Sequence, residues 1–134
     1  MTLEALPPTG PQKPGKVQAI AILTLVSGIT NILWMLFLGV FVFSAIAIVT
    51  IGIGCLLFAL LLLPIILGVF EIIYSAKLLP TPIKPVNPSQ AIAILEICCI
   101  LTGNVISLVV GILALVFYDD ARVKAYFARI NTPA

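Results

Sequence analysis

One apolar run limits the folds that this chain can adopt. From Val17 to Leu79 the sequence is almost continuously apolar, and its first charged side chain is Glu71. The whole chain is 62% hydrophobic and 9% charged, whereas soluble domains average about 45–50% apolar and about 25% charged residues. A soluble domain of this size has too little interior to bury that excess. We therefore expect a single-domain, all-α integral membrane protein.

Two copies of one signature lead into apolar segments. In each copy a polar stretch with proline and lysine precedes the same six residues, Gln18-Ala-Ile-Ala-Ile-Leu23 and Gln90-Ala-Ile-Ala-Ile-Leu95. This internal repeat predicts two helices that begin on the same side of a membrane. The number of spans between the two starts must then be even.

The number of spans in the long apolar run depends on where the chain turns. The run has room for three spans of about 20 residues, or for two longer spans and one turn. Ser44, Thr50, Gly52 and Gly54 offer a place for one turn, and Pro64 is tolerable inside a membrane helix. The repeat favours a transmembrane domain over 17–118 with three spans at about 17–43, 55–79 and 89–118. A four-span bundle is the alternative, and the distribution of Lys and Arg favours it more clearly.

Polar segments flank and interrupt the apolar runs. Residues 1–16 are expected to form a Pro-rich disordered tail, and the prolines from Pro80 to Pro88 exclude a helix there. Residues 119–134 form a polar C-terminal segment with apolar side chains at helical spacing. The spacing predicts a short amphipathic helix in the headgroup region, or else a polar extension of the last span. Its apolar residues are Val123, Tyr126, Phe127 and Ile130.

Two carboxylates, Glu71 and Glu96, lie inside the apolar segments. A carboxylate inside a membrane helix costs a few kcal/mol, so such residues tend to be functional or paired. Both lie roughly 10–12 Å from the Pro-rich connector at about 1.5 Å rise per residue, which predicts the same depth. Two carboxylates that meet in a low dielectric should not both be ionised, so the pair is a candidate ion or proton site or a contact to a partner. Alternatively, both lie near headgroups, paired with Lys77 or with water.

Small and polar residues predict close helix packing. Cys99, Gly103, Ser107 and Gly111 recur at every fourth position and are expected to form one helix-packing face. The polar intramembrane residues Asn31 and Asn104 are expected to form hydrogen bonds across helices. This pattern indicates where helices approach one another, but it does not identify the partner helix.

The sequence carries no signature of an enzyme, a metal site or a cofactor site. It has no histidine, no Gly-rich phosphate loop and no nucleophile–base set. Cys55, Cys98 and Cys99 lie in apolar runs, where cysteine acts as a small packing residue. The formal net charge of +2 is too small to indicate nucleic-acid binding.

The Pro-rich tail, the Gln-Ala-Ile-Ala-Ile-Leu start of a span and the short polar C-terminus resemble small multi-span proteins of bacterial inner membranes. The resemblance implies no activity. We expect a multi-pass protein of the cytoplasmic membrane, with the lipid bilayer and other membrane helices as partners, in a homo-oligomer or a larger complex. The leading hypothesis is a non-enzymatic structural or accessory component that acts through helix packing. The alternative is a small oligomeric transporter or ion- or proton-conducting protein that uses Glu71 and Glu96.

Overall fold

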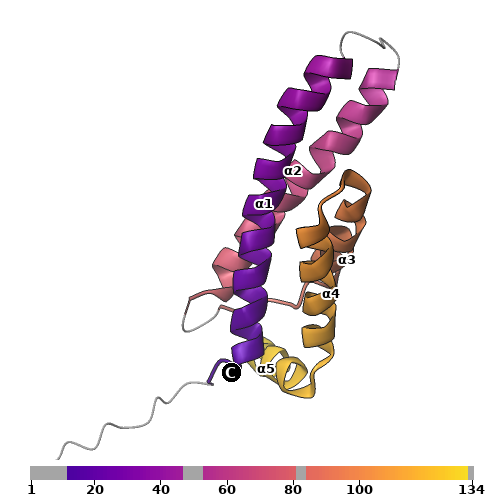
Figure 1. Cartoon of the computed structure of the whole chain (residues 1–134). Helices are drawn as coiled ribbons and strands as arrows, with labels where there is room; N and C mark the ends of the chain where they lie inside the picture. Colours follow the sequence, from indigo (N-terminus) through magenta and orange to yellow (C-terminus); the bar gives the residue numbers. More distant parts are fainter. Residues whose placement is uncertain (1–11, 47–52, 81–83, 133–134) are drawn as a thin grey trace, which may run out of the picture.

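The computed structural model describes residues 12–46, 53–80 and 84–132, and all regular structure in these residues is helical. The expectation of an all-α fold is confirmed. Two long helices come first, α1 (Gly15–Ile46) and α2 (Ile53–Leu78), and they pack against each other along their length (Figure 1). Of the residues expected to turn between them, Ser44 lies in α1 and Gly54 in α2, whereas Thr50 and Gly52 lie outside the described residues. Most of the expected disordered tail, residues 1–11, also lies outside them.

One described helix is long and apolar enough to cross a membrane, namely α1 over Gly15–Gly39. The three-span arrangement is not confirmed, because segment 89–118 is two helices rather than one. It consists of α3 (Gln90–Cys98), a short 3-10 helix η1 (Cys99–Thr102) and α4 (Val105–Asp119). The two legs return on each other as a hairpin (Figure 1).

The turn of the second hairpin is built by three consecutive residues. Thr102 is the last residue of η1, and its hydroxyl group donates to the carbonyl oxygen of Cys99 at 2.7 Å. Gly103 follows with φ of 78°, a left-handed conformation that suits glycine at a helix C-terminus. Asn104 then caps α4, because its side-chain oxygen accepts from the backbone N–H of Ser107 at 3.2 Å. This stop-and-start sequence breaks the helix in the middle of the apolar run.

The four legs alternate in direction, so α1 and α3 begin at the same end of the bundle (Figure 1). The two copies of the Gln-Ala-Ile-Ala-Ile-Leu sequence therefore begin at this end. The legs of the second hairpin are short. At about 1.5 Å per residue, α4 is about 22 Å long, which is less than the roughly 30 Å thickness of the hydrocarbon core of a bilayer. The first hairpin extends well beyond the tip of the second.

The final helix, α5 (Ala121–Asn131), closes the end of the bundle where α1 and α3 begin. It is the short amphipathic helix expected from the spacing, and its apolar face packs on protein. Val123 and Phe127 are 0% and 3% exposed and belong to one core cluster with Val17 and Leu78. Amphipathicity predicts that a face is buried, but it does not tell whether lipid or protein covers it.

A single acidic residue, Asp120, fixes the start of α5. Its carboxylate accepts from the backbone N–H groups of Arg122 at 2.9 Å and Val123 at 3.4 Å, and it pairs with Lys16 at 2.5 Å. The hydrogen bond from Lys16 is the main cause that holds the pKa of Asp120 below its ordinary value of 3.8.

Because the folded-state pKa of Asp120 is depressed, its stabilising contribution is complete above pH 3.8 and is lost as the pH falls through the folded-state pKa. We expect Asp120→Asn, which keeps a capping oxygen but loses the ion pair, to melt at a lower temperature than the parent at neutral pH. The difference should disappear in strong acid. Thermal unfolding in detergent between about pH 6 and pH 2 measures it; a difference that does not change with pH would contradict this role.

The surface of the bundle is apolar while part of its interior is polar. Large hydrophobic side chains are exposed on every leg, and Leu33, Phe37 and Val116 are among them, at 61%, 56% and 60%. In contrast, several polar side chains are completely buried. Buried polar side chains beneath a surface this rich in large hydrophobic residues are unusual for a soluble protein. The buried polar side chains are Thr24, Ser27, Asn31, Glu71, Ser75, Glu96, Asn104 and Ser107.

Candidate functional site

Six buried polar side chains meet where the first hairpin contacts the second. We call them the polar cluster: Ser27 and Asn31 of α1, Glu71 of α2, Glu96 of α3, and Asn104 and Ser107 at the start of α4. Asn104 is 3% exposed and the other five are 0% exposed. Every leg of the two hairpins therefore contributes to the cluster.

Asn31 connects the two hairpins at the centre of the cluster. Its side-chain N–H₂ group donates to both carboxylate oxygens of Glu71, at 3.1 and 3.0 Å. Its side-chain oxygen accepts from Asn104 Nδ2 at 2.7 Å and from Ser107 Oγ at 2.9 Å. The hydroxyl groups of Ser27 and Ser107 are 3.0 Å apart and add a second link. Glu71 is thus a well-supported acceptor, and Asn31 has its hydrogen-bonding capacity in use.

Glu96 is buried without any such support. Neither of its carboxyl oxygens has a hydrogen-bond partner among the described residues. Its carboxyl group lies within the range at which the Glu71 carboxyl group and the Ser27 hydroxyl act on it, although neither forms a hydrogen bond with it. Burying an ionised carboxylate without donors is very costly, and a second carboxyl group beside it increases the cost. The arrangement therefore favours a proton, or another small cation, at this pair.

Sequence reasoning expected Glu71 and Glu96 at one depth, and the structure brings them together. The alternative partner, Lys77, is exposed at the end of α2 and forms no hydrogen bond or ion pair with either carboxylate. The expected cross-helix role of Asn31 and Asn104 is seen directly in their mutual bond. Ser27 was missed, although Thr24, Ser27 and Asn31 are spaced at i, i+3 and i+7 and so share one face of α1.

Within the first hairpin, two glycines bring the backbones of α1 and α2 together beside the cluster. A Cβ atom added to Gly28 would lie 2.8 Å from the carbonyl oxygen of Gly68 and 3.0 Å from Cβ of Glu71. The third neighbour is Cγ1 of Ile72 at 3.0 Å. The helix that faces Gly28 therefore has the sequence small-x-x-Glu-Ile over residues 68–72. The buried Glu71 lies directly beside this glycine contact.

The second hairpin repeats the same packing with a different order of helices. A Cβ atom on Gly111 of α4 would lie 2.5 Å from the carbonyl oxygen of Ala93 and 2.9 Å from Cβ of Glu96. Its third neighbour is Cγ1 of Ile97, also at 2.9 Å. Ala93-Ile-Leu-Glu96-Ile97 thus has the small-x-x-Glu-Ile sequence of α2. Each carboxylate of the pair is positioned by its own glycine contact.

The two packing units run in opposite directions along the bundle. The Glu-bearing helix is α2 in the first hairpin and α3 in the second, and these helices are antiparallel. The glycine is on α1 in the first unit and on α4 in the second.

The expected packing face of Cys99, Gly103, Ser107 and Gly111 is not one helix face, because the chain reverses inside it. Gly103 is exposed in the turn, Ser107 belongs to the polar cluster, and Gly111 packs within the hairpin. Cys99 is buried and Cys98 is exposed, both as free thiols; the side chain of Cys55 lies outside the described residues. The small residues thus join helices of this chain.

Within residues 12–46, 53–80 and 84–132, no group of three His, Cys, Asp or Glu side chains is placed to hold a metal ion. Comparison with protein-family models, with curated proteins and with solved structures finds no match. The function is therefore inferred from the geometry of the site.

Proposed function

We propose that this chain is an integral membrane protein in which α1 and α2 cross the bilayer. The apolar surface, the buried polar cluster and the length of α1 support this placement. The α3–α4 hairpin then enters from the end that carries α5 and returns before reaching the other side. Backbone polar groups at membrane depth need partners within the protein, and the Trp34 indole supplies one to the turn, because its Nε1 donates to the carbonyl oxygen of Thr102 at 3.1 Å.

The function that the site supports best is reversible proton binding and transfer by the Glu71–Glu96 pair. The observation that carries it is the fully buried Glu96 carboxyl group without a donor. Because Glu71 receives two contacts from Asn31, Glu71 holds the negative charge while Glu96 holds a proton. The pair then carries one charge rather than two, and the proton is the group that can be released and regained.

A proton suits this site better than a metal cation. Calcium takes about 6–8 oxygen ligands, and magnesium about six. Here Asn31, Asn104 and Ser107 are already committed to one another, and the Ser27 hydroxyl donates to Ser107. Two carboxyl groups and the lone pairs of the Ser27 oxygen are left. This set is sufficient to hold and pass one proton.

The position of the pair suggests how a proton could be moved across the membrane. Glu71 belongs to one hairpin and Glu96 to the other, and each hairpin is held together internally by a glycine contact. When Glu96 loses its proton, two negative charges face each other across the junction and push the hairpins apart. Reprotonation brings them back, so proton binding is linked to movement at this junction.

Proton movement by the purified protein in liposomes tests the proposal. We expect liposomes with an outward potassium gradient and valinomycin to acidify when they contain the parent protein, as reported by a trapped pH dye. Asp119→Asn, which changes an exposed carboxylate outside the cluster, should acidify at the parent rate. The same rate in protein-free and protein-containing liposomes would contradict proton transfer.

The accessory function expected from the sequence remains a second proposal, now on a different surface. Beyond the tip of the second hairpin, α1 and α2 expose apolar side chains, and no other described helix lies against this part of them (Figure 1). Leu36, Phe37 and Leu63 are examples, at 57%, 56% and 45%. Native mass spectrometry after mild extraction would show a defined partner subunit if another protein covers this surface, and the isolated chain if lipid covers it.

A further inference from the structure

All seven Lys and Arg residues of the chain lie at one end of the bundle. Two lie at the start of α1, one lies near the end of α2, one lies in the connector after α2, and three belong to α5. By the positive-inside rule, this end faces the cytoplasm, where anionic lipids attract basic residues that lie close to the membrane. The seven are Lys13, Lys16, Lys77, Lys84, Arg122, Lys124 and Arg129.

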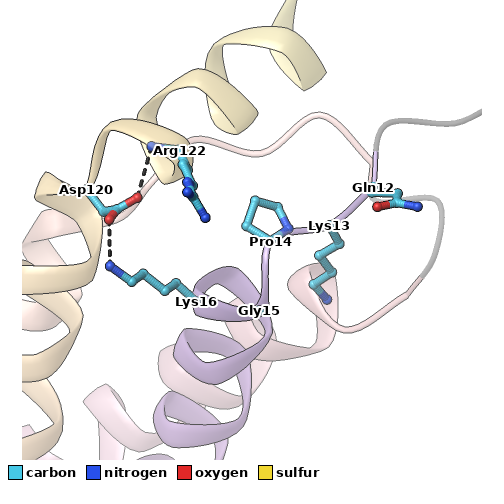
Figure 2. Close-up of a pocket in the computed structure, with 7 residues that line it drawn as sticks. All are labelled: Gln12, Lys13, Pro14, Gly15, Lys16, Asp120 and Arg122. Atoms are coloured by element: carbon cyan, nitrogen blue, oxygen red, sulfur yellow. Dashed lines mark hydrogen bonds and ion pairs between the residues drawn. The ribbon is translucent and has the colours of Figure 1, made fainter.

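A cavity of about 670 Å³ opens in this basic end, between the start of α1 and the start of α5 (Figure 2). Its charged lining consists of Lys13, Lys16 and Arg122, with Asp120 as the one acid. Three positive charges against one negative charge make the cavity cationic. The remaining lining is Gln12, Pro14 and Gly15.

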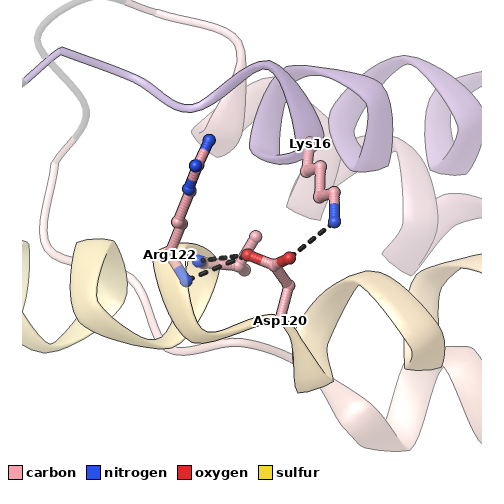
Figure 3. Close-up of polar contacts among 4 residues, drawn as sticks. Lys16, Asp120 and Arg122 are labelled. Atoms are coloured by element: carbon pink, nitrogen blue, oxygen red, sulfur yellow. Dashed lines mark hydrogen bonds and ion pairs between the residues drawn. The ribbon is translucent and has the colours of Figure 1, made fainter.

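The contacts inside the cavity leave one cation available. Asp120 is occupied by Lys16 and by the first backbone N–H groups of α5 (Figure 3), so the acid is neutralised in place. Lys13 donates to the carbonyl oxygens of Leu78 and Leu79 at the end of α2. The Arg122 guanidinium extends toward Pro14 (Figure 2), and it has no ion-pair partner within the described part of the chain.

The cavity lies next to the exposed apolar side chains of α1 and α4. The Lys16 ammonium is 6.0 Å from the centre of the Phe117 ring, and the exposed apolar side chains of α1 and α4 begin within about two turns of it, with Ile22 and Val116 at 45% and 60% exposure. The basic residues therefore stand directly beside the lipid-facing surface. A phosphate group at this border could keep its acyl chains on that surface.

We propose that this cavity binds the phosphate group of an anionic phospholipid of the cytoplasmic leaflet. Arg122 offers a planar pair of N–H donors that matches phosphate oxygens, and Lys13 and Lys16 add positive charge. The proposal rests on the membrane placement proposed above, but it is independent of proton transfer.

Native mass spectrometry of the delipidated full-length chain tests it, with short-chain phosphatidylglycerol and phosphatidylcholine added separately. We expect one phosphatidylglycerol to bind at least tenfold more tightly than phosphatidylcholine. Arg122→Gln should remove this preference and Arg122→Lys should keep part of it. Lys84→Gln is the matched control, since it removes one charge from the same end outside the cavity and should bind like the parent.

Three results would overturn the proposal. Equal binding of the two lipids would show that the cavity does not recognise the net negative charge by which phosphatidylglycerol differs from phosphatidylcholine. An equal loss for Lys84→Gln and Arg122→Gln would show diffuse attraction instead of a site. Displacement of the lipid by millimolar inorganic phosphate would show a site for a free anion. Because no pH gradient is used, failure here leaves the test of proton transfer unaffected.

Discussion

Replacing Glu96 by Gln is expected to abolish proton transfer in liposomes and to leave the fold as stable as the parent or more stable. Glutamine has nearly the same shape but cannot release a proton in this range. Its amide can donate to the Glu71 carboxylate, as the proton of the neutral Glu96 carboxyl group would, so the contact within the pair is kept. The free energy of unfolding should therefore change little where Glu96 is protonated, and should exceed that of the parent where Glu96 would ionise beside Glu71. Acidification rates and thermal unfolding of the same preparations measure both effects.

Glu71→Gln is the matched comparison, because it should reduce both transfer and stability. The Glu71 carboxylate accepts from Asn31 with both oxygens, and an amide in its place would turn one N–H₂ group toward another. We expect a loss of about 1–3 kcal/mol in the free energy of unfolding. If Glu96→Gln is the more destabilising change, or if neither change slows transfer, the assignment of roles within the pair is wrong.

Adding one methyl group at Gly111 is expected to be among the most destabilising small changes in the chain. The new Cβ would lie 2.5 Å from the carbonyl oxygen of Ala93 and 2.9 Å from Cβ of Glu96, so α3 and α4 must separate. Overpacking of this kind costs typically about 1–3 kcal/mol, and here backbone rather than a flexible side chain must move. Gly28→Ala should act similarly against the carbonyl oxygen of Gly68, at 2.8 Å.

Gly39→Ala is the control for these changes, because no atom of the described residues lies within 4 Å of the added Cβ. Alanine is favoured over glycine in a helix by about 1 kcal/mol, so this variant should be neutral or slightly stabilised. Gly103→Ala is intermediate, since its φ of 78° is strained for alanine while its nearest contact, to Trp34, is 3.9 Å. Thermal unfolding in detergent ranks the variants; equal melting of Gly111→Ala and Gly39→Ala would contradict the packing described.

The sequence could predict that the fold is helical, and it also carries the signals for the break in the last apolar segment. Thr102-Gly103-Asn104 contains a helix stop and a helix start. Both legs of the hairpin are apolar, and an apolar run alone does not distinguish one long helix from two short ones. The cap residues, and not the composition, decide the fold here.

The meeting of Glu71 and Glu96 could be anticipated because both distances are counted from the same connector. The contribution of Asn31 and Ser27 could not, since it depends on how α1 is rotated about its axis against the second hairpin. Likewise, small residues predict that two backbones approach closely, but only the structure shows that Gly28 faces Gly68 and Gly111 faces Ala93. Which residue each glycine faces is set by the complete fold.

The most direct test of the account is whether the buried pair holds a proton at neutral pH. Infrared spectroscopy of the protein in lipid detects the carbonyl stretch of a protonated carboxyl group. We predict that the parent shows this band at neutral pH, that Asp119→Asn retains it and that Glu96→Gln lacks it. A parent spectrum without the band, or a band that Glu96→Gln leaves unchanged, would contradict the proposal that Glu71 and Glu96 share one proton.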